Sequence, residues 1–113
     1  MVDVTDNVIT IVRGTTPSLI VDFSDITDFA VADITSVALT IMSRTGKEEF
    51  GLSDMTVADD TLSYHWTQEQ TLSYAYRDVL RLDMHVVANG ERYKVYGIPE
   101  WIRVENTGKN EVM

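Results

Sequence analysis

The sequence predicts an all-β fold, an antiparallel two-sheet, Ig-like sandwich of about eight strands, and three features of the chain support this prediction. Apolar and polar residues alternate with a period of two along most of the 113 residues, as expected of strands with one buried and one solvated face. Turn sequences separate the alternating segments at short intervals. Residues 67–70, Thr-Gln-Glu-Gln, match a helix capping box and predict one short helical crossover between the sheets.

Strands are expected wherever the alternation is bounded by turn residues. Asn89-Gly90 is the strongest hairpin signal, because both residues tolerate the positive φ angles of a type I′ turn. Thr45-Gly46 and Asp59-Asp60 indicate two further hairpins. The expected strands cover residues 7–12, 18–24, 34–44, 47–50, 55–58, 61–66, 79–88, 91–96 and 101–105.

The segment 79–88 shows the alternation most clearly. Leu80, Leu82 and Met84 fall on one side of an extended chain, whereas Arg81 and Asp83 fall on the other. We therefore expect the leucines and the methionine to face the core.

Two segments are expected to be irregular. Residues 13–17, Arg-Gly-Thr-Thr-Pro, form a turn, since Pro17 has no N–H and stands only at the start or edge of a strand. Residues 25–33 are acidic and lack the alternation. Three of their apolar residues are expected to cover one end of the core: Ile26, Phe29 and Val31.

The composition fits a single domain, residues 1–113, with a short polar tail at about 106–113. A chain of this length buries a core without disulfides or metals. The sequence contains no cysteine, which excludes both a disulfide-stapled module and a thiolate metal site.

The charge of the chain limits its partners. The net charge is −9, from 18 acidic and 9 basic residues, and such a surface repels phosphate backbones, so we expect no nucleic-acid partner.

The first residues lack the basic and apolar regions of a signal peptide, and no apolar run approaches the ~20 residues that cross a bilayer. We therefore expect no cleaved leader and no membrane partner. The acidic excess lies mostly early, which predicts an acidic end and a more neutral end, because several basic residues lie in the second half, among them Arg77, Arg81, Arg92, Lys94 and Arg103.

The two histidines are the first candidates for catalysis. His65 and His85 both lie on expected polar faces of strands. No H-x-H or H-E-x-x-H spacing is present to hold a metal, and no G-x-S-x-G elbow is present to activate a serine. We interpret both as surface histidines and expect no enzymatic activity and no cofactor. A histidine beside a carboxylate in a deep pocket would argue for an enzyme.

Carboxylates offer two weaker alternatives. Calcium ligation by the early aspartates does not fit the D-x-D-x-D-G spacing, in which alternate residues converge on the ion. Glu48-Glu49 and Asp59-Asp60 do not resemble a catalytic pair, because adjacent side chains of a strand point to opposite faces. The aspartates of the calcium hypothesis are Asp22, Asp25, Asp28 and Asp33.

Aromatic residues are the candidates for partner binding. Tyrosine and tryptophan are favoured at interfaces, because they bury a large apolar ring and keep a polar tip. Tyr96 is out of phase with Tyr93 and Val95, and so is expected to face away from the core. The predicted contact residues are Tyr74, Tyr76, Tyr96 and Trp101.

Residues 9–23, Ile-Thr-Ile-Val-Arg-Gly-Thr-Thr-Pro-Ser-Leu-Ile-Val-Asp-Phe, resemble the start of small tail- and baseplate-associated proteins of prophages from Gram-positive gut bacteria. Those proteins begin with a strand, an R-G-D/T-T-P-like turn and a second strand. The resemblance continues through residues 34–42 and 62–71 and the Asn-Gly hairpin. It covers roughly residues 7–104 and is weakest at 25–33 and 74–77.

The resemblance implies a non-enzymatic structural module of the phage tail or baseplate, an Ig-like baseplate-adaptor-type domain that acts through protein–protein contacts. Its implied partners are other virion proteins and further copies of itself, and its implied location is the virion, assembled in the host cytoplasm. The alternative is a carbohydrate-binding module in which exposed tyrosine and tryptophan rings form a platform for sugars, with Asp, Asn or Arg beside them.

Overall fold

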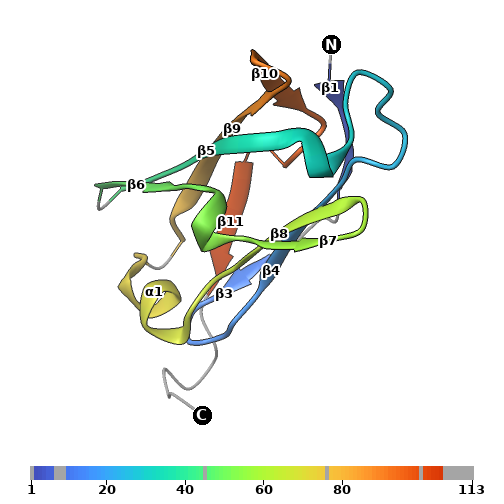
Figure 1. Cartoon of the computed structure of the whole chain (residues 1–113). Coiled ribbons are helices and arrows are strands. Elements are labelled where there is room, and N and C mark those ends of the chain that lie inside the picture. Colours follow the sequence, from blue (N-terminus) through green and yellow to red (C-terminus); the bar gives the residue numbers. More distant parts are fainter. Residues whose placement is uncertain (1, 7–9, 45, 76, 100, 106–113) are drawn as a thin grey trace.

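The computed structural model describes residues 2–6, 10–44, 46–75, 77–99 and 101–105, and they form an all-β sandwich of two sheets (Figure 1). The predicted class, an all-β sandwich of two sheets, is confirmed. The strands are β1 (Val2–Asp3), β2 (Thr5–Asp6), β3 (Ile11–Val12), β4 (Ser18–Asp22), β5 (Ile34–Ser43), β6 (Gly46–Phe50), β7 (Thr56–Ala58), β8 (Thr61–His65), β9 (Val79–Ala88), β10 (Glu91–Tyr96) and β11 (Trp101–Glu105). The helix is α1 (Gln68–Ser73), and the 3-10 turns are η1 (Val31–Asp33) and η2 (Leu52–Asp54).

The larger sheet is organised around β9. β5 pairs with β9 along one side and carries β6 on its outer edge. The other side of β9 is shared, since β10 pairs with its C-terminal part and β11 with its N-terminal part. β1 adds to β10 and β3 adds to β11, both in parallel. This sharing brings the ends of β10 and β11 to the same flank of β9.

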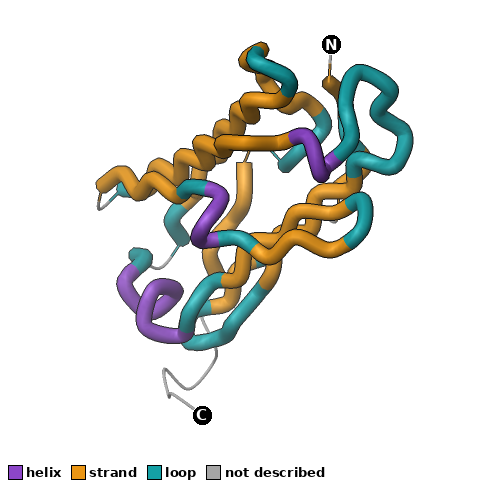
Figure 2. Tube along the Cα trace, viewed as in Figure 1, coloured by secondary structure: helices purple, strands orange, loops and turns teal. Residues whose placement is uncertain are grey.

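The smaller sheet has the order β2-β4-β8-β7 and is antiparallel throughout. The tube of Figure 2 shows the two sheets as separate layers of strands, with the helix at one end. The four N-terminal strands alternate between the layers, with β1 and β3 in the larger sheet and β2 and β4 in the smaller. The start of the chain therefore ties the two sheets together.

One hydrophobic core fills the space between the sheets. Leu80, Leu82 and Met84 of β9 are buried, as the alternation predicts. Phe29 and Val31 of the acidic segment are also buried, and Phe29 packs on Phe23 and Tyr93 with ring centroids 5.9 and 5.0 Å away. Their predicted role in covering one end of the core is confirmed.

The helical crossover forms where the capping box predicts it. The Gln70 N–H donates to Oγ1 of Thr67 at 3.1 Å, and the Thr67 N–H donates to Oε1 of Gln70 at 3.4 Å. These bonds satisfy N–H groups that have no partner inside a helix. α1 then leads the chain from β8 of the smaller sheet to β9 of the larger.

The Asn-Gly hairpin is also confirmed. Asn89 and Gly90 have φ angles of 52° and 80°, and the strands they join are β9 and β10. Asp59, at the β7–β8 turn, likewise has a positive φ of 48°.

The N-terminal strands differ from the prediction. A strand was expected at residues 7–12, but the described part of this range contains only β3 at Ile11–Val12, and residues 7–9 lie outside the described residues. Two unpredicted strands, β1 and β2, precede it. Each is two residues long and is held by a distant partner strand, so alternation within the segment is too short to reveal it.

None of the helices in the described part of the chain is long and apolar enough to span a membrane.

Candidate functional site

The outer face of the larger sheet, turned away from the smaller one, gathers most of the exposed chemistry. Residues paired across a ladder point to the same side of a sheet, so the register defines this face. Arg81 pairs with Met42 on one side and with Trp101 on the other. We call this surface the basic face; its residues on β1, β5, β6, β9, β10 and β11 include Asp3, Thr40, Met42, Lys47, Glu49, Val79, Arg81, Asp83, His85, Arg92, Lys94, Tyr96, Trp101, Arg103 and Glu105.

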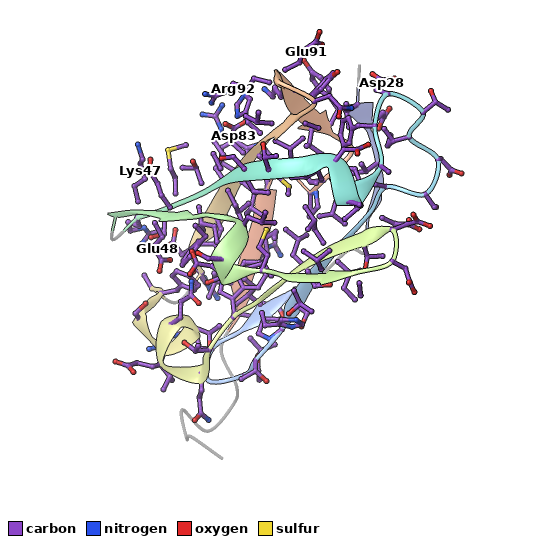
Figure 3. The ribbon with its side chains drawn as sticks, viewed as in Figure 1. Asp28, Lys47, Glu48, Asp83, Glu91 and Arg92 are labelled. Atoms are coloured by element: carbon purple, nitrogen blue, oxygen red, sulfur yellow. The ribbon has the colours of Figure 1, made fainter. Side chains whose placement is uncertain are left out.

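The basic face reverses the charge balance of the molecule. It carries five basic and four acidic side chains, the acidic ones being Asp3, Glu49, Asp83 and Glu105, in a protein with a net charge of −9. Figure 3 shows Lys47, Asp83 and Arg92 on one side of the larger sheet and Glu48 on the other. Five of the nine lysines and arginines of the chain lie on the basic face: Lys47, Arg81, Arg92, Lys94 and Arg103.

Two exposed aromatic rings lie on this face beside cations. Trp101 is 60% exposed and Tyr96 is 45% exposed. The guanidinium carbon of Arg81 lies 5.8 Å from the Trp101 ring centroid, and Nζ of Lys94 lies 5.5 Å from the Tyr96 ring centroid. Both separations fall within the ~6 Å range of a cation–π contact.

A hollow of about 250 Å³ opens between β9 and the end of β10. Asp83 is its acidic residue, and its carboxylate lies 3.3 Å from Nδ1 of His85 and 3.8 Å from Nζ of Lys94. We call it the Tyr96 hollow; its lining residues are Arg81, Leu82, Asp83, Lys94, Val95, Tyr96, Gly97 and Ile98.

Gly97 fixes the far wall of the Tyr96 hollow. Its φ angle is +92°, and a Cβ at this position would lie 2.1 Å from the carbonyl oxygen of Val4. The Val4 N–H donates to the Tyr96 carbonyl at 2.8 Å. The backbone after Tyr96 is thus pressed against the N-terminal segment, which sets the end of β10 and the position of its ring.

This arrangement combines flat apolar surface with hydrogen-bonding groups. The Trp101 and Tyr96 rings offer faces for stacking, Arg81 and Lys94 offer donors, and Asp83 offers an acceptor. Such a mixture suits a ligand that has both an apolar face and hydroxyl or carboxylate groups along its edge.

The structure therefore brings together two of the four predicted contact residues, Tyr96 and Trp101. Tyr76 lies outside the described residues. Tyr74 is only 2% exposed, so the expectation that it presents its ring to a partner is wrong. The reason is that its hydroxyl is satisfied inside the protein.

Tyr74 belongs to a buried hydrogen-bond network. Its hydroxyl accepts from Nε1 of Trp66 at 3.0 Å and donates to Oε1 of Glu48 at 2.7 Å. Burial, and then the bond to the Glu48 carboxylate, raise the pKa of Tyr74 above its ordinary value. Tyr74 thus joins β6 to the segment that follows α1.

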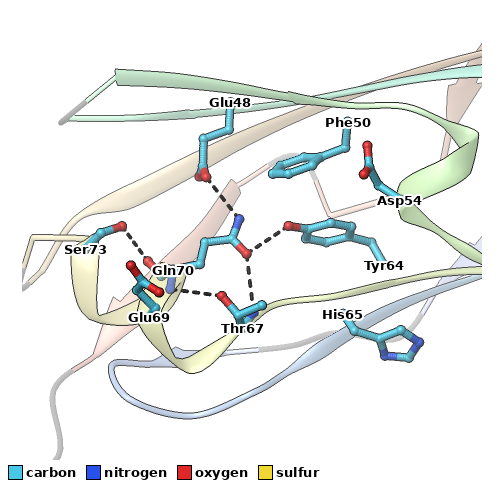
Figure 4. Close-up of a pocket in the computed structure, with 9 residues that line it drawn as sticks. All are labelled: Glu48, Phe50, Asp54, Tyr64, His65, Thr67, Glu69, Gln70 and Ser73. Atoms are coloured by element: carbon cyan, nitrogen blue, oxygen red, sulfur yellow. Dashed lines mark hydrogen bonds between the residues drawn. The ribbon is translucent and has the colours of Figure 1, made fainter.

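A groove of about 520 Å³ lies beside this network, between β6 and β8 (Figure 4). Gln70 is central to it, because its amide oxygen accepts from the Tyr64 hydroxyl at 2.8 Å and its amide nitrogen donates to Oε2 of Glu48 at 3.2 Å. Burial raises the pKa of Tyr64 to about 12. We call it the inter-sheet groove; it is lined by Glu48, Phe50, Asp54, Tyr64, His65, Thr67, Glu69, Gln70 and Ser73.

The polar groups at the centre of the inter-sheet groove hold α1 in place. Gln70 bonds to both Glu48 and Tyr64 and thereby connects both sheets to the helix. Glu48 pairs with buried Ile41 and Glu49 with Thr40, so they point to opposite faces of β6, as expected of neighbours on a strand. We therefore regard the basic face, whose rings are exposed, as the better candidate site.

The histidines lie on two different sheets. Nδ1 of His65 lies 2.7 Å from Oγ of Ser18 on the exposed side of the smaller sheet. In a catalytic triad a carboxylate orients the second ring nitrogen, and no hydrogen bond or ion pair found within the described residues joins a carboxylate to His65. His85 lies beside Asp83 on the basic face.

The early aspartates Asp22 and Asp33 accept hydrogen bonds from backbone N–H groups of their own loops. Oδ1 of Asp22 accepts from the Ser24 N–H at 2.9 Å, which lowers the Asp22 pKa, and Oδ2 of Asp33 accepts from the Ala30 N–H at 3.0 Å. Within the described ranges, no group of three or more histidine, aspartate or glutamate residues is placed to hold a metal ion.

Arg81, Asp83 and Lys94 were missed as site residues. Alternation had placed Arg81 and Asp83 on the solvated side of their strand, which was the available signal. Their position beside Trp101 and Tyr96 depends on the pairing of β9 with both β10 and β11, and no local pattern encodes that pairing.

No protein-family model matches the sequence, and a search of curated proteins finds no matching relative. Among solved structures, the chain is similar to the crystal structure of a bromine derivative of BhCBM56, a carbohydrate-binding module. The TM-score is 0.51, the sequence identity is 14%, and the alignment covers 89% of each chain. At this identity the likeness concerns the β-sandwich fold.

Proposed function

We propose that this protein is a non-catalytic carbohydrate-binding module whose ligand lies on the basic face, across the Trp101 ring and the Tyr96 hollow. The observation that carries the proposal is the placement of two exposed aromatic rings on one side of the larger sheet with Arg81, Asp83 and Lys94 beside them.

The chemistry of a sugar matches this surface. A pyranose has a face of C–H groups that packs on an aromatic ring, and hydroxyls around its edge that need donors and acceptors. Trp101 supplies the larger exposed ring. Asp83 accepts hydrogen bonds from hydroxyls, and Arg81 donates them. Because both rings are already held beside cations, little side-chain freedom is lost on binding.

The comparison with solved structures supports the same class of ligand. BhCBM56 is a carbohydrate-binding module, and its fold is similar to that of this chain over 89% of each. The absence of a predicted catalytic motif agrees with a module that binds without transforming its ligand.

The experiment is a glycan-array screen of the purified protein, followed by calorimetric titration of the strongest ligand. We expect Trp101→Ala to weaken binding at least about tenfold, which corresponds to roughly 1.4 kcal/mol. Tyr96→Ala is expected to weaken it less, since its ring is less exposed. The control is Ile20→Ala, which removes an exposed apolar side chain from the smaller sheet. Equal affinity of Trp101→Ala and the native protein would contradict the proposal.

A second candidate is a structural module of a phage tail or baseplate, located in the virion and bound to other virion proteins and to copies of itself. The sequence resemblance favours it, and so does the edge strand β7, at which the order of the smaller sheet ends and where Val57 is exposed. An edge strand offers N–H and C=O groups to a neighbouring strand.

This second candidate predicts self-association through β7. Size-exclusion chromatography with light scattering should detect oligomers at high protein concentration, and Val57→Lys should shift them to monomers. A native protein that stays monomeric, and that does not copurify with virions on a density gradient, would argue against this candidate. It would leave the sugar-binding proposal intact.

A further inference from the structure

We infer that the glycan bound on the basic face is anionic, a chain of uronic acids whose carboxylates are held by Arg81 and Lys94. This inference rests on the proposed function of the same site and specifies the chemical class of the ligand. A neutral glycan would require the exposed rings and hydrogen-bond donors beside them, but it would not require those donors to be positively charged.

Positively charged side chains are concentrated on the basic face. Five of the nine basic residues of the chain lie on the basic face, although the molecule as a whole has a net charge of −9. Surface charge that only kept the protein soluble would not require a cationic patch on one sheet. The patch therefore matches an anionic partner.

Two of these cations lie directly beside the exposed aromatic rings. Arg81 lies 5.8 Å from the Trp101 ring centroid, and Lys94 lies 5.5 Å from that of Tyr96. A glycan laid across the open sides of the rings brings the edges of its sugar units past Arg81 and Lys94. In a uronic acid that edge carries a carboxylate, which Arg81 can bind with two parallel N–H···O bonds.

Charged side chains of both signs surround the Tyr96 hollow. Its charged lining residues are Arg81, Lys94 and the single carboxylate of Asp83. Asp83 also lies 3.3 Å from Nδ1 of His85 and 3.8 Å from Lys94. Asp3, which pairs with Tyr96, brings a second carboxylate to the Gly97 end of the hollow. Arg81, on the Trp101 side, takes part in none of the ion pairs found among the described residues.

The net negative charge of the protein does not prevent this binding. At physiological ionic strength charges are screened over about 8 Å, so a bound carboxylate responds mainly to the groups that line the hollow. The early aspartates Asp25 and Asp28 lie in the segment between β4 and η1 and are not part of the basic face.

The experiment compares hexamers of galacturonate and of mannuronate with their methyl esters, which keep the same sugars and linkages but remove the charge, and includes a neutral glucan hexamer. Calorimetric titration should show at least one uronate hexamer bound about tenfold more tightly than its ester, because each charged hydrogen bond adds about that much. Raising NaCl from about 50 to about 300 mM should weaken binding of the uronate hexamer and leave binding of its methyl ester unchanged.

Variants separate the two contributions. Arg81→Gln and Lys94→Gln should each weaken uronate binding by roughly three- to tenfold and weaken ester binding by a clearly smaller factor, because only the uronate loses a charged hydrogen bond. Arg77→Gln is the matched control, since it removes one positive charge from the exposed turn before β9, outside the basic face. Circular dichroism would verify that each variant is folded.

Four results would overturn the inference. Equal binding of acid and ester, or binding of the neutral hexamer alone, would remove the anionic preference but leave the carbohydrate-binding module standing. Failure of every hexamer to bind, together with an empty glycan array, would remove both. A single-stranded oligonucleotide bound as tightly as the best uronate would identify a general polyanion surface instead.

Discussion

Arg81 and Trp101 are direct partners across the β9–β11 ladder, and the guanidinium carbon of Arg81 lies 5.8 Å from the centroid of the Trp101 ring. The register fixes both residues on the same face, and the exposed ring remains open to solvent on its other side. The contact therefore orients the ring without covering it, which is what a binding platform requires.

Loss of this contact should loosen the Trp101 ring without unfolding the protein. Arg81→Ala is expected to reduce the free energy of unfolding by less than about 1 kcal/mol, since the pair is exposed. Acrylamide quenching of tryptophan fluorescence should increase, while in Trp101→Phe the remaining emission comes from buried Trp66 and should resist quenching. Unchanged quenching in Arg81→Ala would mean that Arg81 does not restrain the ring.

Gly97→Ala should be one of the most destabilising single substitutions in the chain. The added Cβ would meet the Val4 carbonyl oxygen at 2.1 Å, and φ is +92°, so both contact and backbone strain oppose alanine. We expect a loss of about 2 kcal/mol or more in urea unfolding. Gly90→Ala is the matched control, because φ is +80° but nothing lies within 4 Å of its Cβ, and it should lose about 1 kcal/mol. Equal losses would refute the contact with Val4.

Tyr74→Phe should show that the buried hydroxyl is structural. Its removal leaves Nε1 of Trp66 without an acceptor and Oε1 of Glu48 without a donor, at a cost of about 2 kcal/mol in the free energy of unfolding. In the control Tyr93→Phe, the lost hydroxyl bonds only to the exposed carboxylate of Glu91 at 3.0 Å, and we expect a loss below about 0.5 kcal/mol. Similar losses for the two variants would contradict this role.

The same network should make the protein sensitive to alkali. The pKa of Tyr64 is raised from 10.0 to about 12 in the folded state, and that of Tyr74 is raised as well. Below pH 10 both hydroxyls are protonated in the folded and in the unfolded protein, so the network contributes its full stabilisation. Above pH 10 the unfolded chain loses the tyrosine protons first, so the free energy of unfolding falls as the pH rises from about 10 to about 12. The urea midpoint should follow this fall, and less steeply in Tyr74→Phe; a midpoint independent of pH would exclude the mechanism.

Much of the sandwich could be predicted because its signals are local. The alternation at residues 79–88 and the Asn89-Gly90 turn gave the bounds of β9 and the start of β10. The capping box at Thr67 and Gln70 likewise positioned α1. In each case a few neighbouring residues determine the backbone.

The remainder depended on contacts between distant segments. Tyr74 is buried because Glu48, 26 residues earlier, accepts its hydroxyl hydrogen, and neither residue signals this pairing in its own segment. The exposure of Tyr96 followed from its phase in the strand. The platform that it forms with Trp101 and Arg81 required β10 and β11 to share one flank of β9.

The most direct test of the account is a map of where a glycan binds. Amide chemical shifts of the labelled protein would be followed during titration with the strongest ligand from the array. We expect the largest changes at Arg81, Asp83, Lys94, Tyr96 and the indole N–H of Trp101, all on the basic face. Changes centred on Glu48 and Gln70 in the inter-sheet groove, or no changes at any glycan concentration, would contradict it.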